Sequence, residues 1–308
     1  MMPSFHIKGV VSAILAALCW GMALVMSKGV LESFPPIFLL LIQLASSAVF
    51  IWSIVIFNKI EISDVRKLKK VSVLGLFEPF LTYILVLIGL TYSRASDAAL
   101  LQSLESIFIV MLASLLFKEK ISRLFVFLSL VILFGLYFSI GGDLKKLMGT
   151  GMVRNILIVA GMFTAAVYVV LTSRSIATAD AIVIVACQQM VALVATSVVF
   201  AGEYLFTDYV FSSPSIGAVI LAIVSGIFQY ALAFTFYLIA LKHISAGLAG
   251  MFLNLVPVFG IVGAYLFLSE KMENIQIIGS VITICALLMM SMLSSKASKT
   301  SDVHLIQY

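Results

Sequence analysis

Two glutamates stand out because each lies deep inside a long apolar segment. Glu78 follows Gly75-Leu76-Phe77, and Glu105 comes ten residues after Ala95. At 1.5 Å per residue, Glu105 is expected roughly 15 Å along a helix, near the middle of a ~30 Å hydrocarbon core. Ionisable groups at such depth usually face a cavity or a partner, and apolar surroundings disfavour the charged carboxylate. We expect each carboxyl to carry a proton or bind a substrate ammonium group; the alternative is a hydrogen-bonded glutamate that ties helices together.

Polar amides and aromatic rings inside the apolar segments form a second candidate group. An amide in a membrane helix either hydrogen-bonds a substrate or bridges neighbouring helices, and an aromatic ring either lines a cavity or packs. Both interpretations stay open for each residue. The residues expected to line a central cavity with the two glutamates are Gln43, Gln102, Gln188, Gln229, Asn254, Trp20 and Tyr83.

The composition identifies the class of protein. Of the 308 residues, 63% are hydrophobic and 11% charged, whereas soluble domains carry about 25% charged residues. The net charge of +5 comes from basic residues in short connectors, which predicts membrane topology and contact with lipid rather than nucleic-acid binding. The three cysteines and three histidines show no metal-ligand spacing, and no phosphate-binding loop is present. We therefore expect neither an enzyme nor a bound cofactor or metal.

The apolar segments predict an all-α membrane protein with ten transmembrane helices. A span needs about 20 mostly apolar residues. Starting inside, 13 Lys and Arg fall on the inner side and 6 on the outer side, so both termini are expected in the cytoplasm. The predicted spans are 8–28, 36–57, 70–91, 95–117, 122–141, 153–173, 180–200, 214–241, 245–268 and 273–293.

An internal repeat divides the chain. The segment 75–120 recurs without a gap at 226–271, shifted by 151 positions, with matching glycine and charged anchors at both ends. Glu78 corresponds to Gln229 and Glu105 to Val256, so both carboxylates belong to one half. Five spans per half is an odd number, which predicts an inverted second copy and a substrate site near the midplane. The expected units are the repeats 1–141 and 142–293 and a cytoplasmic tail, 294–308.

These motifs resemble the EamA family of the drug/metabolite transporter superfamily, whose members contain two copies of a five-helix unit. Two departures are visible, since Ser106 stands where the first copy often has a proline and Gln43 where many relatives have arginine. The matching motifs are Cys19-Trp20-Gly21, Arg94-Ala95-Ser96, Ser245-Ala246-Gly247, Asn254-Leu255-Val256-Pro257-Val258, Phe117-Lys118-Glu119 and Leu268-Ser269-Glu270.

The resemblance implies a secondary transporter of the inner membrane that exports a small metabolite, such as an amino acid, by alternating access. Glu78 or Glu105 is the expected carrier of a coupling proton. One alternative is a proton-independent exchanger or facilitator, in which a carboxylate binds an amine-bearing or cationic metabolite. A remote alternative is a non-transporting membrane scaffold. The sequence leaves the oligomeric state open, and a monomer is sufficient for this mechanism.

Overall fold

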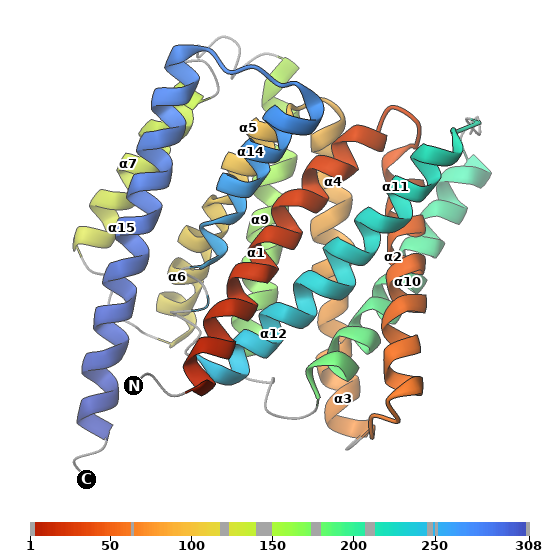
Figure 1. The fold of residues 1–308 in the computed structure, drawn as a ribbon, viewed down its shortest axis with the longest axis horizontal. Helices are drawn as coiled ribbons and strands as arrows, with labels where there is room; N and C mark the ends of the chain where they lie inside the picture. The colour runs from red at the N-terminus through yellow and green to blue at the C-terminus, as the bar shows by residue number, and fades with distance from the viewer. Residues whose placement is uncertain are drawn as a thin grey trace.

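The computed structural model is an all-helical bundle (Figure 1). It describes residues 4–62, 65–117, 123–139, 150–173, 180–206, 213–244, 249 and 252–305, and no strand occurs among these residues. The described elements are α1 (Ser4–Val30), α2 (Pro36–Phe57), α3 (Val65–Ser72), η1 (Val73–Leu76), η2 (Phe77–Leu81), α4 (Thr82–Thr91), α5 (Ala95–Gln102), α6 (Leu104–Phe117), α7 (Arg123–Ser139), α9 (Thr150–Ser173), α10 (Ala181–Phe206), α11 (Ile216–Gly226), η4 (Ile227–Leu232), α12 (Ala233–His243), α14 (Val256–Leu268) and α15 (Asn274–Leu305).

Seven helical segments in the described part of the chain are long and apolar enough to cross a membrane, so the chain is a multi-pass membrane protein. The ten predicted spans exceed this number because three further apolar helices are shorter: Arg123–Ser139, Val256–Leu268 and Asn274–Met289. The repeat boundary at 141/142 and the motif residues Lys118, Glu119 and Ser245-Ala246-Gly247 lie outside the described residues. At the C-terminal end, α15 stays helical to Leu305, past the predicted end of the last span at 293.

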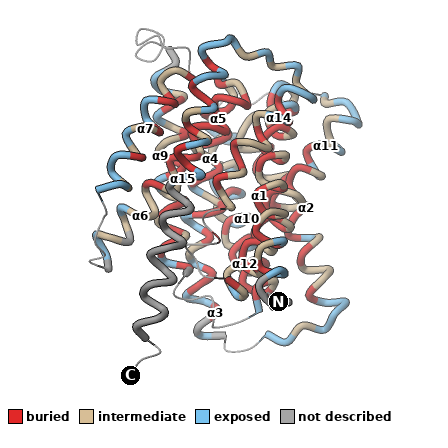
Figure 2. The backbone as a smooth tube through the Cα atoms, turned by 60° about the vertical axis from the view of Figure 1, so that its left-hand side comes forward, coloured by how far each residue is buried: buried red, intermediate tan, exposed pale blue. Residues whose placement is uncertain are grey.

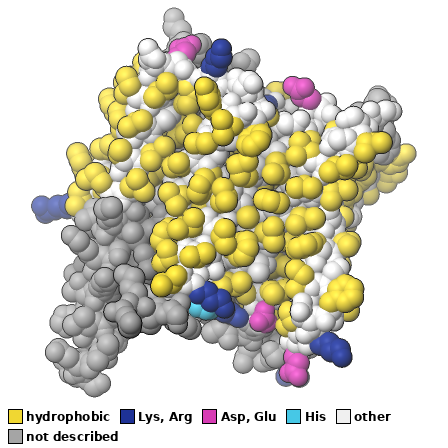
Figure 3. All heavy atoms as spheres, viewed as in Figure 1, with side chains coloured by type: hydrophobic (Ala, Val, Ile, Leu, Met, Phe, Trp, Pro, Cys, Tyr) yellow, Lys and Arg dark blue, Asp and Glu magenta, His cyan; other side chains and the backbone are white. Residues whose placement is uncertain are grey.

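The outer surface is suited to lipid. Large apolar side chains such as Val49, Phe57 and Leu205 are exposed, whereas the buried faces of the helices point into the bundle (Figure 2). On the face seen in Figure 3, charged side chains lie at the margins and apolar side chains cover the area between them. Such a surface would be unfavourable in water and matches a hydrocarbon environment. The start of α1 and the end of α15 lie at the same end of the bundle (Figure 1).

The segment that contains Glu78 is interrupted by a π-type turn. Proline lacks the backbone N–H that a regular helix requires, so Pro79 prevents the normal hydrogen-bond pattern. The turn η2 follows η1, and Glu78 has an extended backbone at φ −142° and ψ 125°. The second half contains the turn η4 at the equivalent place, although it has no proline there. The duplicated sequence therefore produces an irregular turn in both halves.

A second pair of breaks also follows the repeat. In the first half, α5 ends at Gln102, Ser103 forms a turn, and α6 begins at Leu104. In the second half, a turn at Asn254 precedes α14. This turn interrupts the predicted span 245–268, which the hydropathy had indicated as one continuous helix. Pro257 lies in the first turn of α14, where the missing N–H has no intrahelical partner to lose.

Two glycines show how closely the halves pack. A Cβ atom at Gly75 would overlap the main chain of Gln188, and one at Gly226 would overlap the main chain of Gln43. Gly75 lies in η1 of the first half and contacts α10 of the second half, while Gly226 ends α11 of the second half and contacts α2 of the first. Each half thus presents the same glycine to the main chain of the other half.

Candidate functional site

The centre of the bundle contains a polar chain that links Glu78 to the second half. The Glu78 side chain is buried and lies beside Tyr83 of α4, close enough to interact with its hydroxyl. The Tyr83 hydroxyl accepts a hydrogen bond of 2.7 Å from Nε2 of Gln229 in η4. Because its hydroxyl already accepts from Gln229, Tyr83 can donate its own proton to the Glu78 carboxylate. Three of the predicted site residues are therefore in one network.

Glu105 lies beside this network. It is in the first turn of α6, two residues after the break at Ser103, and is half-buried. The carboxyls of Glu78 and Glu105 are close enough to interact electrostatically. Two carboxylates in a poorly solvated site repel each other, so protonation of one of them or a bound cation would stabilise the pair. The sequence predicted both residues as functional but did not predict that their charges would interact.

Gln43 joins the network from α2. Its side chain is fully buried, and Nε2 donates to Ser27 Oγ at 2.9 Å and to Ser225 Oγ at 2.7 Å. The Tyr230 hydroxyl donates to Gln43 Oε1 at 3.4 Å. The Tyr230 ring packs edge-to-face on Tyr83 with centroids 4.8 Å apart. The tyrosine pair therefore connects the hydrogen bonds of Gln43 with that between Gln229 and Tyr83.

Gln188 and its neighbour Gln189 extend the polar centre into α10. The Tyr168 hydroxyl donates to Gln188 Oε1 at 2.9 Å, and Gln188 Nε2 donates to the Val71 carbonyl at 3.1 Å. Gln189 accepts a 2.6 Å hydrogen bond from Ser47 Oγ, and its Nε2 donates to the Tyr230 carbonyl. Both amides bridge the halves. Gln189 was not among the predicted site residues, although it is an adjacent amide in the same span.

The remaining predicted residues lie apart from these bonds. The Trp20 ring packs edge-to-face against Phe234 at 5.2 Å, and its Nε1 has no hydrogen-bond partner among the described residues. Gln102 is the last residue of α5 and is half-buried. Asn254 is buried and donates to the Leu287 carbonyl of α15 at 3.3 Å. Asn254 therefore joins α15 to the preceding turn and does not touch the Glu78 network.

The sequence-based site also lacked three tyrosines and one acid that lie near the centre or at one end of the bundle. The rings of Tyr168, Tyr230 and Tyr237 are buried and lie near enough to Glu78 to interact with its charge. Asp97 is buried in α5, and its Oδ1 has no hydrogen-bond partner in the described part of the chain. The tyrosines lie in predicted spans, where an aromatic ring more often packs than lines a cavity, and Asp97 lies close to the predicted membrane edge. Within the described residues, no group of His, Cys, Asp and Glu is arranged to hold a metal ion.

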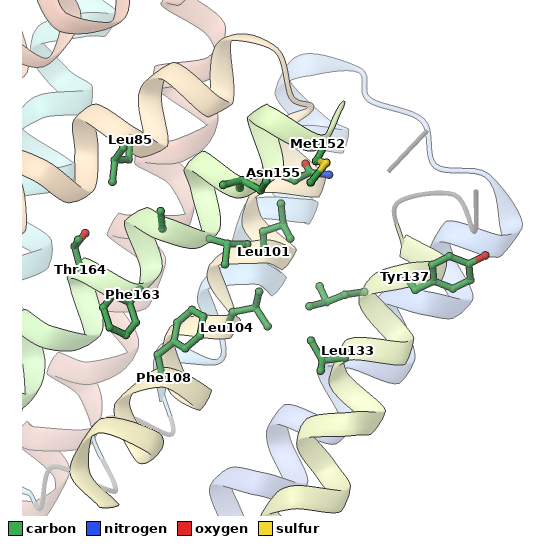
Figure 4. Close-up of a pocket in the computed structure, with 14 residues that line it drawn as sticks. Leu85, Leu101, Leu104, Phe108, Leu133, Tyr137, Met152, Asn155, Phe163 and Thr164 are labelled. Atoms are coloured by element: carbon green, nitrogen blue, oxygen red, sulfur yellow. The ribbon is translucent and has the colours of Figure 1, made fainter. Parts of the chain in front are cut away.

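A separate apolar cavity of about 730 Å³ opens between α7, α9 and the α5–α6 segment (Figure 4). Leu104, Phe108 and Phe163 face it from one side and Leu133 from the other, while the Tyr137 ring points away from them. Neither Glu78 nor Glu105 lines this cavity. In this conformation the central polar side chains are hydrogen-bonded to one another, and the apolar cavity is a different feature of the bundle.

Known proteins agree with this architecture. A solved structure titled "Crystal structure of protein" superposes with a TM-score of 0.70, covering 94% of this chain and 98% of its own at 17% identity, which shows a shared fold. The "Riboflavin transporter ImpX" of Fusobacterium nucleatum subsp. nucleatum (strain ATCC 23726 / VPI 4351) is 28% identical over 141 residues. That match spans 43% of this chain and 46% of the relative, so the chain matches less than half of the relative's length. Residues 7–141 and 152–292 both match the EamA-like transporter family. The chain therefore belongs to the EamA-like transporter family.

Proposed function

We propose that the protein is a secondary transporter that exports a small metabolite, such as an amino acid or a related compound, across the inner membrane. The observation that carries this proposal is the polar chain of Glu78, Tyr83 and Gln229: Glu78 lies beside Tyr83, and the Tyr83 hydroxyl accepts from Gln229 of the second half in the middle of the bundle. An intramembrane carboxyl in contact with both halves can change its environment when the halves move. That is the requirement for coupling an ion to transport.

The transport cycle that we propose is alternating access of two inverted five-span repeats, residues 1–141 and 142–293, with ten spans in all. The reciprocal contacts of Gly75 and Gly226 support this arrangement, because two repeats related by a pseudo-twofold axis exchange their contacts in this manner. Both termini are then cytoplasmic. The excess of Lys and Arg on that side and the common end of α1 and α15 support this orientation.

The proposed coupling ion is a proton carried by Glu78 or Glu105. Their proximity supports this role, because protonating one carboxyl removes its repulsion with the other. The same pair also suits the alternative function, an exchanger in which the carboxylates bind an amine-bearing or cationic metabolite without releasing a proton. The two functions differ in one property: only the first is driven by a pH gradient.

Aromatic residues around the carboxylates widen the substrate classes to test. Tyr83, Tyr168, Tyr230 and Tyr237 are buried near Glu78, and aromatic rings can stack on a planar substrate. The partly matching relative is named a riboflavin transporter. Riboflavin therefore belongs beside the amino acids and amines among the candidate substrates.

The test is uptake into proteoliposomes that contain the wild-type protein, with each candidate substrate and with the pH gradient on or off. We expect flux of one substrate that rises when the gradient is imposed and collapses when an ionophore dissipates it. Flux that ignores the gradient but is stimulated by substrate on the opposite side would establish the exchanger. No flux of any kind, from a protein shown to be folded, would favour the non-transporting scaffold.

A further inference from the structure

A second polar cluster joins the two halves at one end of the bundle, away from Glu78. Glu270 follows α14, and Ser269 before it has the left-handed φ of 54°. The Glu270 carboxylate accepts hydrogen bonds from the Ala95 N–H at 2.8 Å, the Ser96 N–H at 3.1 Å and the Ser96 hydroxyl at 2.7 Å. Its Oε2 also lies 3.7 Å from Nε of Arg94. One side chain of the second half therefore holds the start of α5 in the first half.

The helix α5 has no cap of its own. The first N–H groups of a helix lack intrahelical partners, and a carboxylate there satisfies them and complements the helix dipole. Arg94, at the position before α5, makes no capping bond with its side chain. It binds the second half instead, through the Lys271 carbonyl and through Gln276 Oε1 at 3.2 Å. The beginning of α5 is thus stabilised almost entirely by residues 270–276.

Other charged groups gather at this end without taking the place of Glu270. Lys28 Nζ donates to the Leu90 and Thr91 carbonyls at 3.0 and 3.3 Å, and Arg154 Nη1 donates to the Tyr92 carbonyl at 2.9 Å. These cations hold the end of α4. Glu270 remains the acceptor for the start of α5. The end of α4 and the start of α5, on either side of Arg94, are therefore held by different side chains.

The geometry connects this cap to the central site. The eight residues of α5 run from the cap to the break at Ser103, and Glu105 follows two residues later. Along its length α5 packs on α14: a Cβ atom at Gly260 would lie 2.7 Å from Cβ of Ala99. Any movement of α5 away from Glu270 therefore pulls on the turn that positions Glu105.

We propose that Glu270 is a latch: its bonds to Arg94, Ala95 and Ser96 close this end of the transporter, and their release lets α5 separate from α14 and reposition Glu105. The latch deepens the proposed function and rests on it, since it regulates access to the same site. With the proposed orientation the latch closes the outer end. Glu270 is a positioning residue, because it acts on Glu105 through α5.

The experiment follows the exposure of a cysteine placed at this joint. Ala95 is fully buried beside Val25 and Ala264, and Ala95→Cys keeps the backbone N–H that Glu270 binds. This reporter is introduced into a chain in which Cys19, Cys187 and Cys285 are replaced by serine. The rate of labelling by a membrane-impermeant maleimide is then compared with and without Glu270→Gln. The matched control is Glu273→Gln, which removes the same charge from an exposed position three residues away.

We expect Glu270→Gln to raise the labelling rate about tenfold, because charge-assisted hydrogen bonds to a helix N-terminus shift an equilibrium by that order. Glu273→Gln should leave the rate unchanged. Ser96→Ala removes only one of the bonds and should give a smaller increase, so it also serves if Glu270→Gln does not fold. A second reporter, Ala186→Cys in α10, is fully buried and should stay unlabelled, which separates latch opening from general loosening.

The proposal is overturned if the folded Glu270→Gln and Ser96→Ala variants label no faster than the Glu273→Gln control, or if Ala186→Cys is labelled to the same extent. The assay needs no substrate. A protein that transports none of the tested compounds but still shows the labelling increase would leave the latch standing and refute the proposed function alone.

Discussion

The two halves of the molecule share a backbone design and differ in their chemistry. Both contain a π-type turn, η2 and η4, at repeat-equivalent positions. The residue that the turn presents is Glu78 in the first half and Gln229 in the second. After the second break, Glu105 in the first half corresponds to Val256 in the second. Duplication has therefore kept the irregular backbone while the carboxylates occur in one half only.

This difference shows which features belong to the scaffold and which to the site. Gly75 and Gly226 let the main chains of the two halves approach closely, so both halves require a glycine at this position. Tyr83 has its hydroxyl only in the first half, because the equivalent residue is Phe234. The second half contributes the neutral amide of Gln229, which reaches across to Tyr83. A neutral partner can follow a change in protonation at Glu78 without itself changing charge.

The largest expected effect comes from the glycines that both halves share. Gly75→Ala and Gly226→Ala each place a Cβ atom against the main chain of the other half, and overpacking of this kind costs about 1–3 kcal/mol or more. We expect a lower thermal midpoint and less monodisperse protein for both, measured by fluorescence-detected size exclusion after heating. Gly202→Ala in α10 is the control, since its added Cβ has nothing within 4 Å. If only one of the two substitutions lowers the thermal midpoint, the two glycine contacts are not equivalent.

A comparable and again symmetrical effect is expected for the two buried amides against which these glycines pack. Gln43→Ala removes the bonds to Ser27 and Ser225, and Gln188→Ala those to Tyr168 and the Val71 carbonyl. Unpaired buried partners cost ~1–3 kcal/mol each. Both variants should therefore unfold at lower temperature than the wild type. Asn58→Ala, at an exposed amide, should not. Wild-type stability in both variants would show that these networks are dispensable.

Tyr83→Phe tests the difference between the halves. It places in the first half the phenylalanine that the second half has at the equivalent position, Phe234. It removes the hydroxyl between Gln229 and Glu78 and should cost ~1–2 kcal/mol, since Gln229 then has an unpaired donor. Tyr92→Phe, at an exposed tyrosine, is the control. Restoration of the thermal midpoint by adding Gln229→Leu, which removes the unpaired donor, would support the pairing. Independent effects of the two changes would contradict it.

The smallest effect is expected at Asn254. Its one hydrogen bond, 3.3 Å to the Leu287 carbonyl, is of the kind that contributes ~0.6 kcal/mol between membrane helices. Asn254→Ala should lower the thermal midpoint only slightly, and the apparent affinity for substrate should stay the same. A large loss of substrate affinity would show instead that Asn254 enters the substrate site in another conformation.

Local patterns explain how much was predictable from the sequence. Hydropathy predicted where the helical segments lie, and the repeat predicted which residues of the two halves correspond. The breaks at Ser103 and Asn254 were not predicted, because the apolar runs around them are continuous and hydropathy shows no interruption there. The pairing of Gln229 with Tyr83 spans 146 residues, and it depends on how two helices pack, which no local pattern contains.

Neighbouring residues illustrate the same limit. Gln188 and Gln189 are identical in type and adjacent, yet one binds Tyr168 and the other Ser47, because successive side chains on a helix point in directions about 100° apart. The sequence placed Glu270 just after the predicted span 245–268. It could not indicate that this carboxylate caps α5 of the other half, since that contact joins residues 174 and 175 positions apart.

The most direct measurement compares Glu78→Gln and Glu105→Gln with the wild type in proteoliposomes, for gradient-driven flux and for substrate counterflow. Glu273→Gln, at an exposed carboxylate outside the central network, is the control. If the carboxylates of the first half carry the coupling proton, at least one of Glu78→Gln and Glu105→Gln loses gradient-driven flux and keeps counterflow, while Glu273→Gln keeps its dependence on the gradient. If both glutamine variants remain coupled to the gradient, Glu78 and Glu105 are structural residues, and the asymmetry between the halves has no role in coupling.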